Sequence, residues 1–264
     1  MRWCAGRADL LNMGSTVMKS ERGDPLLSFV IPAYDEEAVL GATLGSLTAA
    51  ARAVGRPFEV VVAADSCTDR TVEIAREHGA RVVEVSHRQI SETRNAGAAA
   101  AHGEHLIFVD ADTRVTAEPI VAALDALAAG AIGGGARVCF DGHLPFVARI
   151  LLAGVVWLLR GLCVAPGCFF FCRRADFEGL GGFSRDVFAG EEVWLSLAFK
   201  RRGRFVALDQ HVVTSGRKIR THSGREILAA AFRPLWKGRA AYRAREGLEV
   251  WYGERRDDPG ERVA

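Results

Sequence analysis

Residues 105–113 constrain the fold of this chain more than any other stretch. The apolar run at 106–109 has no polar alternation, which is typical of a strand buried on both faces in a parallel sheet. The run ends at Asp110 and Asp112, and residues two positions apart in an extended chain point to the same side. Paired carboxylates there suit a hard divalent cation that also binds phosphate oxygens. The alternative is a polar turn that closes the strand, since aspartate is common in turns.

Strands and helices alternate through the first half of the sequence. We expect strands at 26–31, 58–64, 81–85 and 105–109, and helices at 36–54, 71–78, 91–101 and 118–129. Acidic or capping residues stand at the starts of these helices, as the orphan amide groups and the dipole of a helix start favour. The order predicts an α/β fold, in which helices cover both faces of a mostly parallel central sheet.

Acidic residues follow three of these four strands, namely Asp35, Asp65, and the pair Asp110 and Asp112. Ligands of parallel α/β sheets bind outside the carboxyl ends of the strands, so these acids predict a pocket for a nucleotide or a nucleotide sugar. The sequence has no Gly-Lys-Ser/Thr phosphate loop and no Gly-x-Gly-x-x-Gly turn after its first strand. We therefore expect a metal ion and basic side chains to hold the phosphates.

The pattern becomes less regular after Gly130. Strands are expected at 131–140 and 168–172, and shorter ones at 205–208 and 212–213. Glu191 and Glu192 begin a helix, which basic residues and Gly203 end.

A wide apolar helical stripe covers residues 144–164 and contains Arg149, Trp157 and Arg160. Two interpretations stay open. The stripe is either a core helix or a subunit contact in a homodimer, or it meets a membrane surface, where tryptophan and flanking arginines are well placed.

Length and charge set further limits. The 264 residues suffice for one large domain, and a net charge of +2 argues against a dedicated nucleic-acid binder. We expect a disordered tail over 1–24, a main domain over 25–225, and a basic amphipathic helix with a charged tail over 226–264. Without a signal peptide or about 18 consecutive apolar residues, the sequence predicts a cytoplasmic protein, with a peripheral position at the inner face of the membrane as the alternative.

The order of short motifs resembles glycosyltransferase family 2, whose members have the GT-A fold. The matching pieces are Pro32-Ala33-Tyr34-Asp35-Glu36-Glu37, Asp65-Ser66-Cys67-Thr68-Asp69, Arg94-Asn95-Ala96-Gly97, Asp110-Ala111-Asp112, and Gly181-Gly182-Phe183 followed by Gly190-Glu191-Glu192. Each is weak alone, but the order and spacing are specific. By this resemblance 25–130 would form the nucleotide-sugar half of the domain and 131–225 the acceptor half.

The resemblance implies donor-binding roles for residues of the first half. Pro32, Ala33, Tyr34 and Glu36 would line the nucleotide, with Tyr34 at the base. Asp65 would accept a hydrogen bond from the base ring, Arg94 would reach the base or the diphosphate, Asp110 would hold the ribose or a metal-bound water, and Asp112 would ligate Mg²⁺ or Mn²⁺. The alternatives are a turn acid for Asp65 and a solvated helix arginine for Arg94.

The resemblance also implies a catalytic base at Glu192, where the family usually has an aspartate preceded by an acid. The pair is Glu191-Glu192 here, so which glutamate acts stays open, and both could simply favour a helix start. Arg217 and Lys218 lie on a loop that could close over the diphosphate, or in a solvated basic tail. His211 could add a metal ligand, although a lone histidine is more often structural.

The family resemblance predicts an inverting, metal-dependent hexosyltransferase that uses a nucleotide-diphosphate sugar. Its acceptor would be a hydroxyl of a sugar, a lipid or a small molecule. A carboxylate would take the proton of that hydroxyl, and the metal would relieve charge on the leaving diphosphate. Two other functions stay open. One is nucleotidyl transfer to a sugar phosphate, which usually has a basic loop where this chain has acids, and the other is non-catalytic binding of a nucleotide sugar.

Overall fold

The computed structural model describes residues 26–142, 146–221, 243, 248 and 252. The tail expected over 1–24 lies outside the described residues, and so does nearly all of the helix and tail expected over 226–264. Within the described part, none of the helices is both long and apolar enough to cross a membrane.

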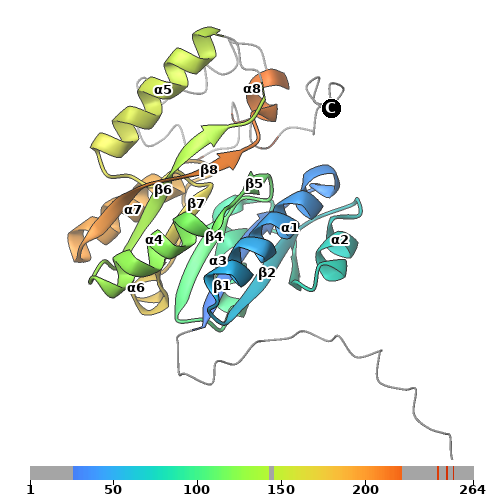
Figure 1. Cartoon of the computed structure of the whole chain (residues 1–264). Helices are drawn as coiled ribbons and strands as arrows, with labels where there is room; N and C mark the ends of the chain where they lie inside the picture. Colours follow the sequence, from blue (N-terminus) through green and yellow to red (C-terminus); the bar gives the residue numbers. More distant parts are fainter. Residues whose placement is uncertain (1–25, 143–145, 222–242, 244–247, 249–251, 253–264) are drawn as a thin grey trace, which may run out of the picture.

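The described strands form one sheet in the order β3-β2-β1-β4-β7-β6-β8-β5 (Figure 1). Their bounds are β1 Leu27–Ala33, β2 Phe58–Asp65, β3 Arg81–Val85, β4 His105–Val109, β5 Thr113–Arg114, β6 Gly133–Phe140, β7 Phe169–Arg173 and β8 Phe205–Thr214. β3, β2, β1 and β4 are parallel, and β7 joins β4 and β6 in antiparallel pairs. The parallel half predicted from the sequence is therefore confirmed.

Helices cover both faces of the sheet. Their bounds are α1 Glu37–Val54, α2 Thr71–Glu77, α3 Ile90–Ala100, α4 Ala117–Ala128, α5 Phe146–Gly161, α6 Arg174–Gly179, α7 Glu191–Arg202 and α8 Arg217–Thr221. Apolar side chains of α1, α2 and α4 pack on one face, and those of α3, α6 and α7 pack on the other. This two-sided burial confirms the predicted α/β class.

The alternating positions of β4 explain why its sequence shows no polar alternation. Ile107 and Val109 belong to the core under α1 and α4, whereas Leu106 and Phe108 belong to the core under α3 and α7. All four are at most 1% exposed. Both faces of the strand are covered, so both sets of positions must be apolar.

The second half departs from the sequence expectation in one respect. The two short strands expected at 205–208 and 212–213 are a single strand, β8, which runs parallel to β6 and antiparallel to β5. A register irregularity between Gly135 and Arg137 of β6 lies within the β6–β8 pair. Asp209 and His211 are exposed positions inside this strand, so the polar residues between the two apolar segments do not interrupt it.

Candidate functional site

A cleft opens at the carboxyl ends of β1, β2 and β4. It is lined by Pro32, Ala33, Tyr34, Glu36, Asp65, Arg88, Gln89, Ile90, Thr93, Asp110, Ala111, Asp112 and Tyr252. Seven residues predicted to bind a donor or a metal therefore meet in one place: Pro32, Ala33, Tyr34, Glu36, Asp65, Asp110 and Asp112. This is the edge at which ligands of parallel α/β sheets bind.

Asp65 ends β2 and organises the loop that leads into α3. Its Oδ1 accepts hydrogen bonds from the backbone amide of Arg88 at 2.9 Å and the hydroxyl of Ser66 at 3.0 Å. Its Oδ2 accepts from the amide of Gln89 at 3.2 Å and the hydroxyl of Thr93 at 2.7 Å. A carboxylate offers about four acceptor positions. These four hydrogen bonds, all from groups of the protein itself, therefore use the acceptor positions of Asp65. A hydrogen bond from a base ring, as predicted for Asp65, would need one of these partners to move.

The loop held by Asp65 brings Arg88 over Tyr34. The Arg88 guanidinium carbon lies 3.9 Å from the centre of the Tyr34 ring, within the range of a cation–π interaction. Arg88 has a positive φ of 52°, a conformation that is uncommon for residues other than glycine. Together the two side chains form a planar, positively charged wall of the cleft, which suits an aromatic base joined to phosphates.

Arg217 reaches the cleft from the first residue of α8. The loop predicted for Arg217 and Lys218 is therefore wrong, because both residues belong to this short helix. Its Nη2 donates to Glu36 Oε2 at 2.7 Å, and the two side chains are 11% and 7% exposed. The prediction that Arg217 belongs to a freely solvated tail is therefore wrong, because a nearly buried acid of the cleft holds it. The Lys218 side chain lies outside the described residues.

Arg94 connects the two halves of the site. Its side chain is 2% exposed and donates from Nη2 to Asp110 Oδ1 at 2.7 Å and to the carbonyl of Gly167 at 3.1 Å. Nη1 donates to Glu191 Oε1 at 2.5 Å. Burial opposes the charge of Arg94, but the attraction of Asp110 and Glu191 raises its pKa. Arg94 is thus a buried cation between two carboxylates, and the alternative of a solvated helix arginine is wrong.

The other residues of the Arg94-Asn95-Ala96-Gly97 motif fix the position of α3. Asn95 exchanges two hydrogen bonds of 2.9 Å with the backbone of Phe183 and so holds the Gly181-Gly182-Phe183 turn. A Cβ at Gly97 would lie 2.6 Å from a methyl carbon of Val30, so only glycine allows α3 to approach β1 this closely. The motif places Arg94 by packing and by these backbone hydrogen bonds.

The two glutamates at the start of α7 have different environments. Glu191 is 3% exposed and paired with Arg94, whereas Glu192 keeps part of its surface accessible. Burial and the charge of Glu191 raise the pKa of Glu192 to about 8, although Arg94 acts in the opposite direction. A carboxylate with a pKa near the operating pH suits a general base. Gly167 lies against both charged side chains, since a Cβ there would lie 3.2 Å from Arg94 Nη2 and 3.4 Å from the Glu192 carboxyl carbon.

Asp110 and Asp112 offer oxygen ligands of the kind that Mg²⁺ and Mn²⁺ prefer. One oxygen of Asp110 is bound to Arg94, while its side chain stays 27% exposed. Asp112 Oδ1 accepts from the Thr214 hydroxyl at 3.2 Å. Among the described residues, no group of three possible ligand atoms within 4.8 Å of one another includes these aspartates and His211. The two aspartates supply oxygen ligands that suit such an ion, and the structure does not bring His211 together with both of them.

Sequence reasoning missed several residues of the cleft wall, namely Arg88, Gln89, Ile90, Thr93 and Tyr252. The Tyr252 hydroxyl donates to the carbonyl of Phe188 at 2.6 Å, and the two rings lie 5.9 Å apart. Tyr252 comes from the segment expected to be a helix and charged tail, and nothing near it in the sequence signals a contact with α3 or with the loop before α7.

Comparisons with known proteins agree with this architecture. The model of the family described as Glycosyl transferase family 2 matches residues 28–181. Among solved structures, the mannosyltransferase PcManGT from Pyrobaculum calidifontis, in complex with GDP-Man and Mn²⁺, superposes with a TM-score of 0.61 at 19% identity over 78% of this chain and 60% of that one. Glucosyl-3-phosphoglycerate synthase from Mycobacterium tuberculosis, in complex with Mn²⁺, UDP and glucosyl-3-phosphoglycerate, gives 0.57 at 20% identity over 89% and 83%. The fold is GT-A, as predicted.

Sequence relatives match over shorter stretches. Validoxylamine A glucosyltransferase from Streptomyces hygroscopicus subsp. limoneus is 39% identical over 36% of this chain, a match that spans 22% of that enzyme. Undecaprenyl-phosphate 4-deoxy-4-formamido-L-arabinose transferase from Pseudomonas paraeruginosa is 35% identical over 40% of this chain and 33% of that enzyme. The matches thus span a third or less of these relatives. Since the family match covers more than half of the sequence, the chain belongs to glycosyl transferase family 2.

Proposed function

We propose that this protein transfers a sugar from a nucleotide-diphosphate sugar to an acceptor hydroxyl, with inversion at the anomeric carbon. The observation that carries the proposal is the Arg94 bridge, which joins Asp110 at the end of β4 to Glu191 at the start of α7. One guanidinium thereby sets the distance between the donor cleft and the helix that carries Glu192. Transfer in one displacement needs this proximity, because donor and acceptor must meet with their reacting atoms about 3–3.5 Å apart.

The donor would lie along the carboxyl ends of β1, β2 and β4. Tyr34 and Arg88 would stack on the base, and Arg217 would exchange its ion pair with Glu36 for one with the diphosphate. A divalent metal, Mn²⁺ or Mg²⁺, would supply Lewis-acid relief of the charge on the leaving diphosphate. Asp112 would hold that ion, with the second carboxylate oxygen of Asp110 as a further ligand. Solved relatives of this fold carry UDP or GDP-Man together with Mn²⁺, which supports this choice of donor and metal.

Glu192 would act as the general base. Its elevated pKa lets the carboxylate take the proton of the acceptor hydroxyl as that oxygen attacks the anomeric carbon. Glu191 would keep Arg94 in place and, through its own negative charge, would hold Glu192 at a pKa near the operating pH. The pairing of Glu191 with Arg94 and the partial accessibility of Glu192 support this assignment of the two roles.

The proposal is tested by incubating the protein with UDP- and GDP-sugars and Mn²⁺, with and without candidate acceptors. Release of nucleoside diphosphate, abolished by a chelator and by Glu192→Gln, is the expected result. Nucleotidyl transfer would instead consume a nucleoside triphosphate and release pyrophosphate. Binding of the donor without any nucleoside diphosphate release, across sugar, lipid and small-molecule acceptors, would identify a non-catalytic binding protein and overturn the proposal.

A further inference from the structure

Helix α5 and the residue directly after it carry three of the four exposed large apolar side chains among the described residues. Trp157 is 76% exposed and Leu158 is 52% exposed, and Leu162, just after the helix, is 53% exposed. The only other such residue in the described part is Val121 on α4, which is 42% exposed. Three large apolar side chains within six positions of one helix end form a contiguous patch, and such patches mark interaction surfaces.

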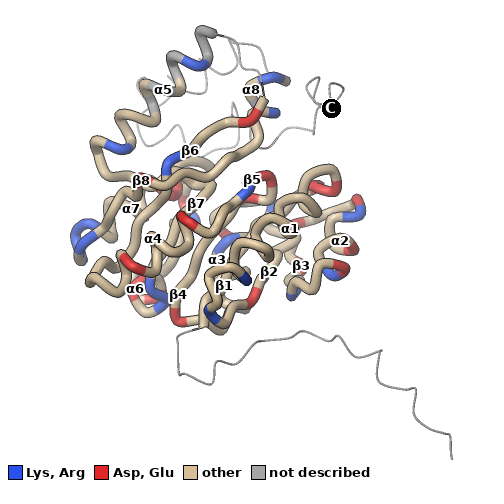
Figure 2. Tube along the Cα trace, in the orientation of Figure 1, with Lys and Arg blue, Asp and Glu red and all other residues tan. Residues whose placement is uncertain are grey.

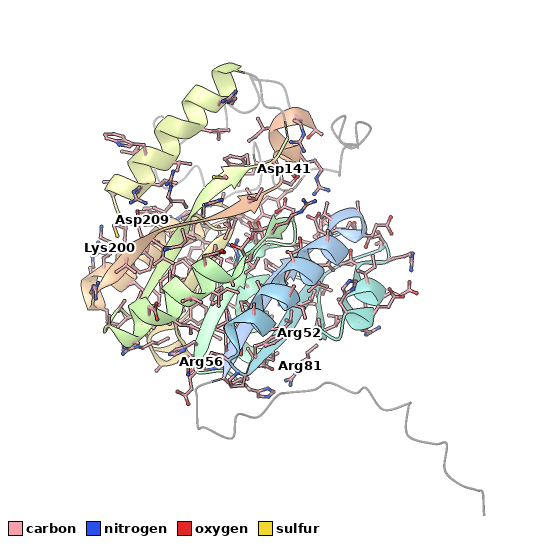
Figure 3. The ribbon with its side chains drawn as sticks, in the orientation of Figure 1. Arg52, Arg56, Arg81, Asp141, Lys200 and Asp209 are labelled. Carbon is pink, nitrogen blue, oxygen red and sulfur yellow. The ribbon has the colours of Figure 1, made fainter. Side chains whose placement is uncertain are left out.

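The groove between α5 and β6 is positively charged. It has a volume of about 840 Å³, and its charged lining residues are Arg137, Arg149 and Arg160, with no acid among the residues that line it. Asp209, which is 82% exposed, pairs with Arg160 at the rim and lies close to α5 in Figure 3. Arg137 and Arg149 have no acidic partner in the described part of the chain. Two arginines without an acidic partner among the described residues therefore line the groove that Trp157 also lines.

Helix α5 stands apart from the layers that bury the other helices (Figure 1). Arg149 and Arg160 are the charged residues of its sequence, and Figure 2 shows them as two blue segments on a helix that is otherwise without charge. No acidic residue lies on it. A helix with an exposed tryptophan, aliphatic side chains and arginines is suited to the boundary between lipid headgroups and acyl chains.

We propose that α5 docks the protein on an anionic phospholipid surface. Trp157, Leu158 and Leu162 enter the headgroup layer, and Arg137 and Arg149 contact the lipid phosphates. The arginines make the surface selective, since each basic residue near an anionic membrane strengthens binding about fivefold. A second copy of the chain would instead bring these unpaired arginines together with like charges, which opposes a self-contact through this face. The mode of attachment is peripheral, and it is independent of the glycosyl-transfer proposal.

The test is sedimentation of the full chain with vesicles of phosphatidylcholine containing phosphatidylglycerol, at low salt. We expect binding to these vesicles, weak binding to pure phosphatidylcholine, and release at high salt. Trp157→Ser should lower the partition coefficient about tenfold or more, because it removes the largest apolar contact. Arg149→Gln should lower it about fivefold. The matched controls are Val121→Ser, which changes an exposed apolar residue of α4, and Arg52→Gln, which changes an exposed arginine of α1. Both helices lie away from α5 in Figure 1, and Figure 3 labels Arg52.

Each other outcome overturns the proposal. Absence of sedimentation at low salt excludes a lipid surface, and equal binding to both kinds of vesicle excludes the role of the arginines. Loss of binding in 10 mM inorganic phosphate at matched ionic strength would identify a site for a free anion. A protein that is dimeric by analytical ultracentrifugation and becomes monomeric on Trp157→Ser would identify a second copy as the occupant of this face. Equal effects of the control and test substitutions would exclude α5 as the contact.

Discussion

Replacement of Glu192 by glutamine is predicted to change stability and catalysis in opposite directions. Burial and the charge of Glu191 raise the pKa of Glu192 from 4.5 to about 8. An acid with a higher pKa in the folded than in the unfolded protein binds more protons when folded. The free energy of unfolding therefore falls as the pH rises from the unfolded pKa to the folded one. Glutamine cannot ionise, so the variant lacks this loss.

The size of this stability change follows from the difference between the folded and unfolded pKa values of Glu192. The folded and unfolded pKa values of Glu192 are about 8 and 4.5. At about 1.4 kcal/mol for each pKa unit, this difference corresponds to a loss of at most about 5 kcal/mol in the free energy of unfolding. The Glu192 side chain is partly accessible, and water lowers the effect in a high-dielectric environment to on the order of 2–3 kcal/mol. We expect Glu192→Gln to match the unmodified protein at about pH 4, below the unfolded pKa, and to exceed its stability by that amount above about pH 8. Turnover should fall about 10²–10⁴-fold.

Denaturant unfolding at the two pH values measures the stability effect, and release of nucleoside diphosphate measures turnover. Glu77→Gln is the matched control, because Glu77 has an exposed side chain on α2. It should shift stability equally at both pH values and leave turnover unchanged. The reasoning about Glu192 would be refuted if the Glu192→Gln difference in stability were the same at both pH values, or if the variant kept full turnover.

Three further substitutions test neighbouring parts of the site. Glu191→Gln should shift the acid limb of the pH–rate profile to lower pH, because it removes the negative charge that opposes ionisation of Glu192. An acid limb that stays at the same pH, with normal turnover, would contradict this effect of Glu191 on Glu192. Arg94→Gln should lower the free energy of unfolding by about 3–5 kcal/mol, because it leaves the buried Glu191 without its cation. Adding Glu191→Gln should restore more than about 1 kcal/mol of that loss in denaturant unfolding. Strictly additive effects of the two substitutions would argue against the Arg94–Glu191 ion pair. Arg217→Gln should weaken the binding of a nucleoside diphosphate about tenfold, as measured by calorimetry. An unchanged affinity would mean that Arg217 binds Glu36 and does not contact the diphosphate.

The sequence predicts the first half of the fold well because the signals there are local. The uninterrupted apolar run of β4 directly reflects burial on both faces. The acids at the strand ends meet in one cleft because parallel strands end at the same edge. Each of the helices α1, α4 and α7 starts where the sequence places an acid in the first helical turn.

The interactions across the site could not be predicted in this way. Arg94 and Glu191 are separated by 97 positions, and Glu36 and Arg217 by 181, so no local pattern identifies either pair. The sequence predicts that Arg94 reaches a ligand, but it does not identify Asp110 and Glu191 as the carboxylates that hold this side chain. Tyr252 enters the cleft wall from the C-terminal segment, where its neighbours suggest only a charged tail. Such contacts depend on the order of strands in the sheet and on the turn held by Asn95.

Calorimetric titration of UDP and GDP, each with and without Mn²⁺, tests most directly whether the cleft between Tyr34 and Asp112 is a metal-dependent donor site. We predict binding of at least one nucleoside diphosphate that requires Mn²⁺, is lost on chelation and on Asp112→Ala, and persists in Glu192→Gln, because the base acts on the acceptor. Binding of neither nucleotide, or equal binding without metal and in Asp112→Ala, would contradict this assignment of the cleft.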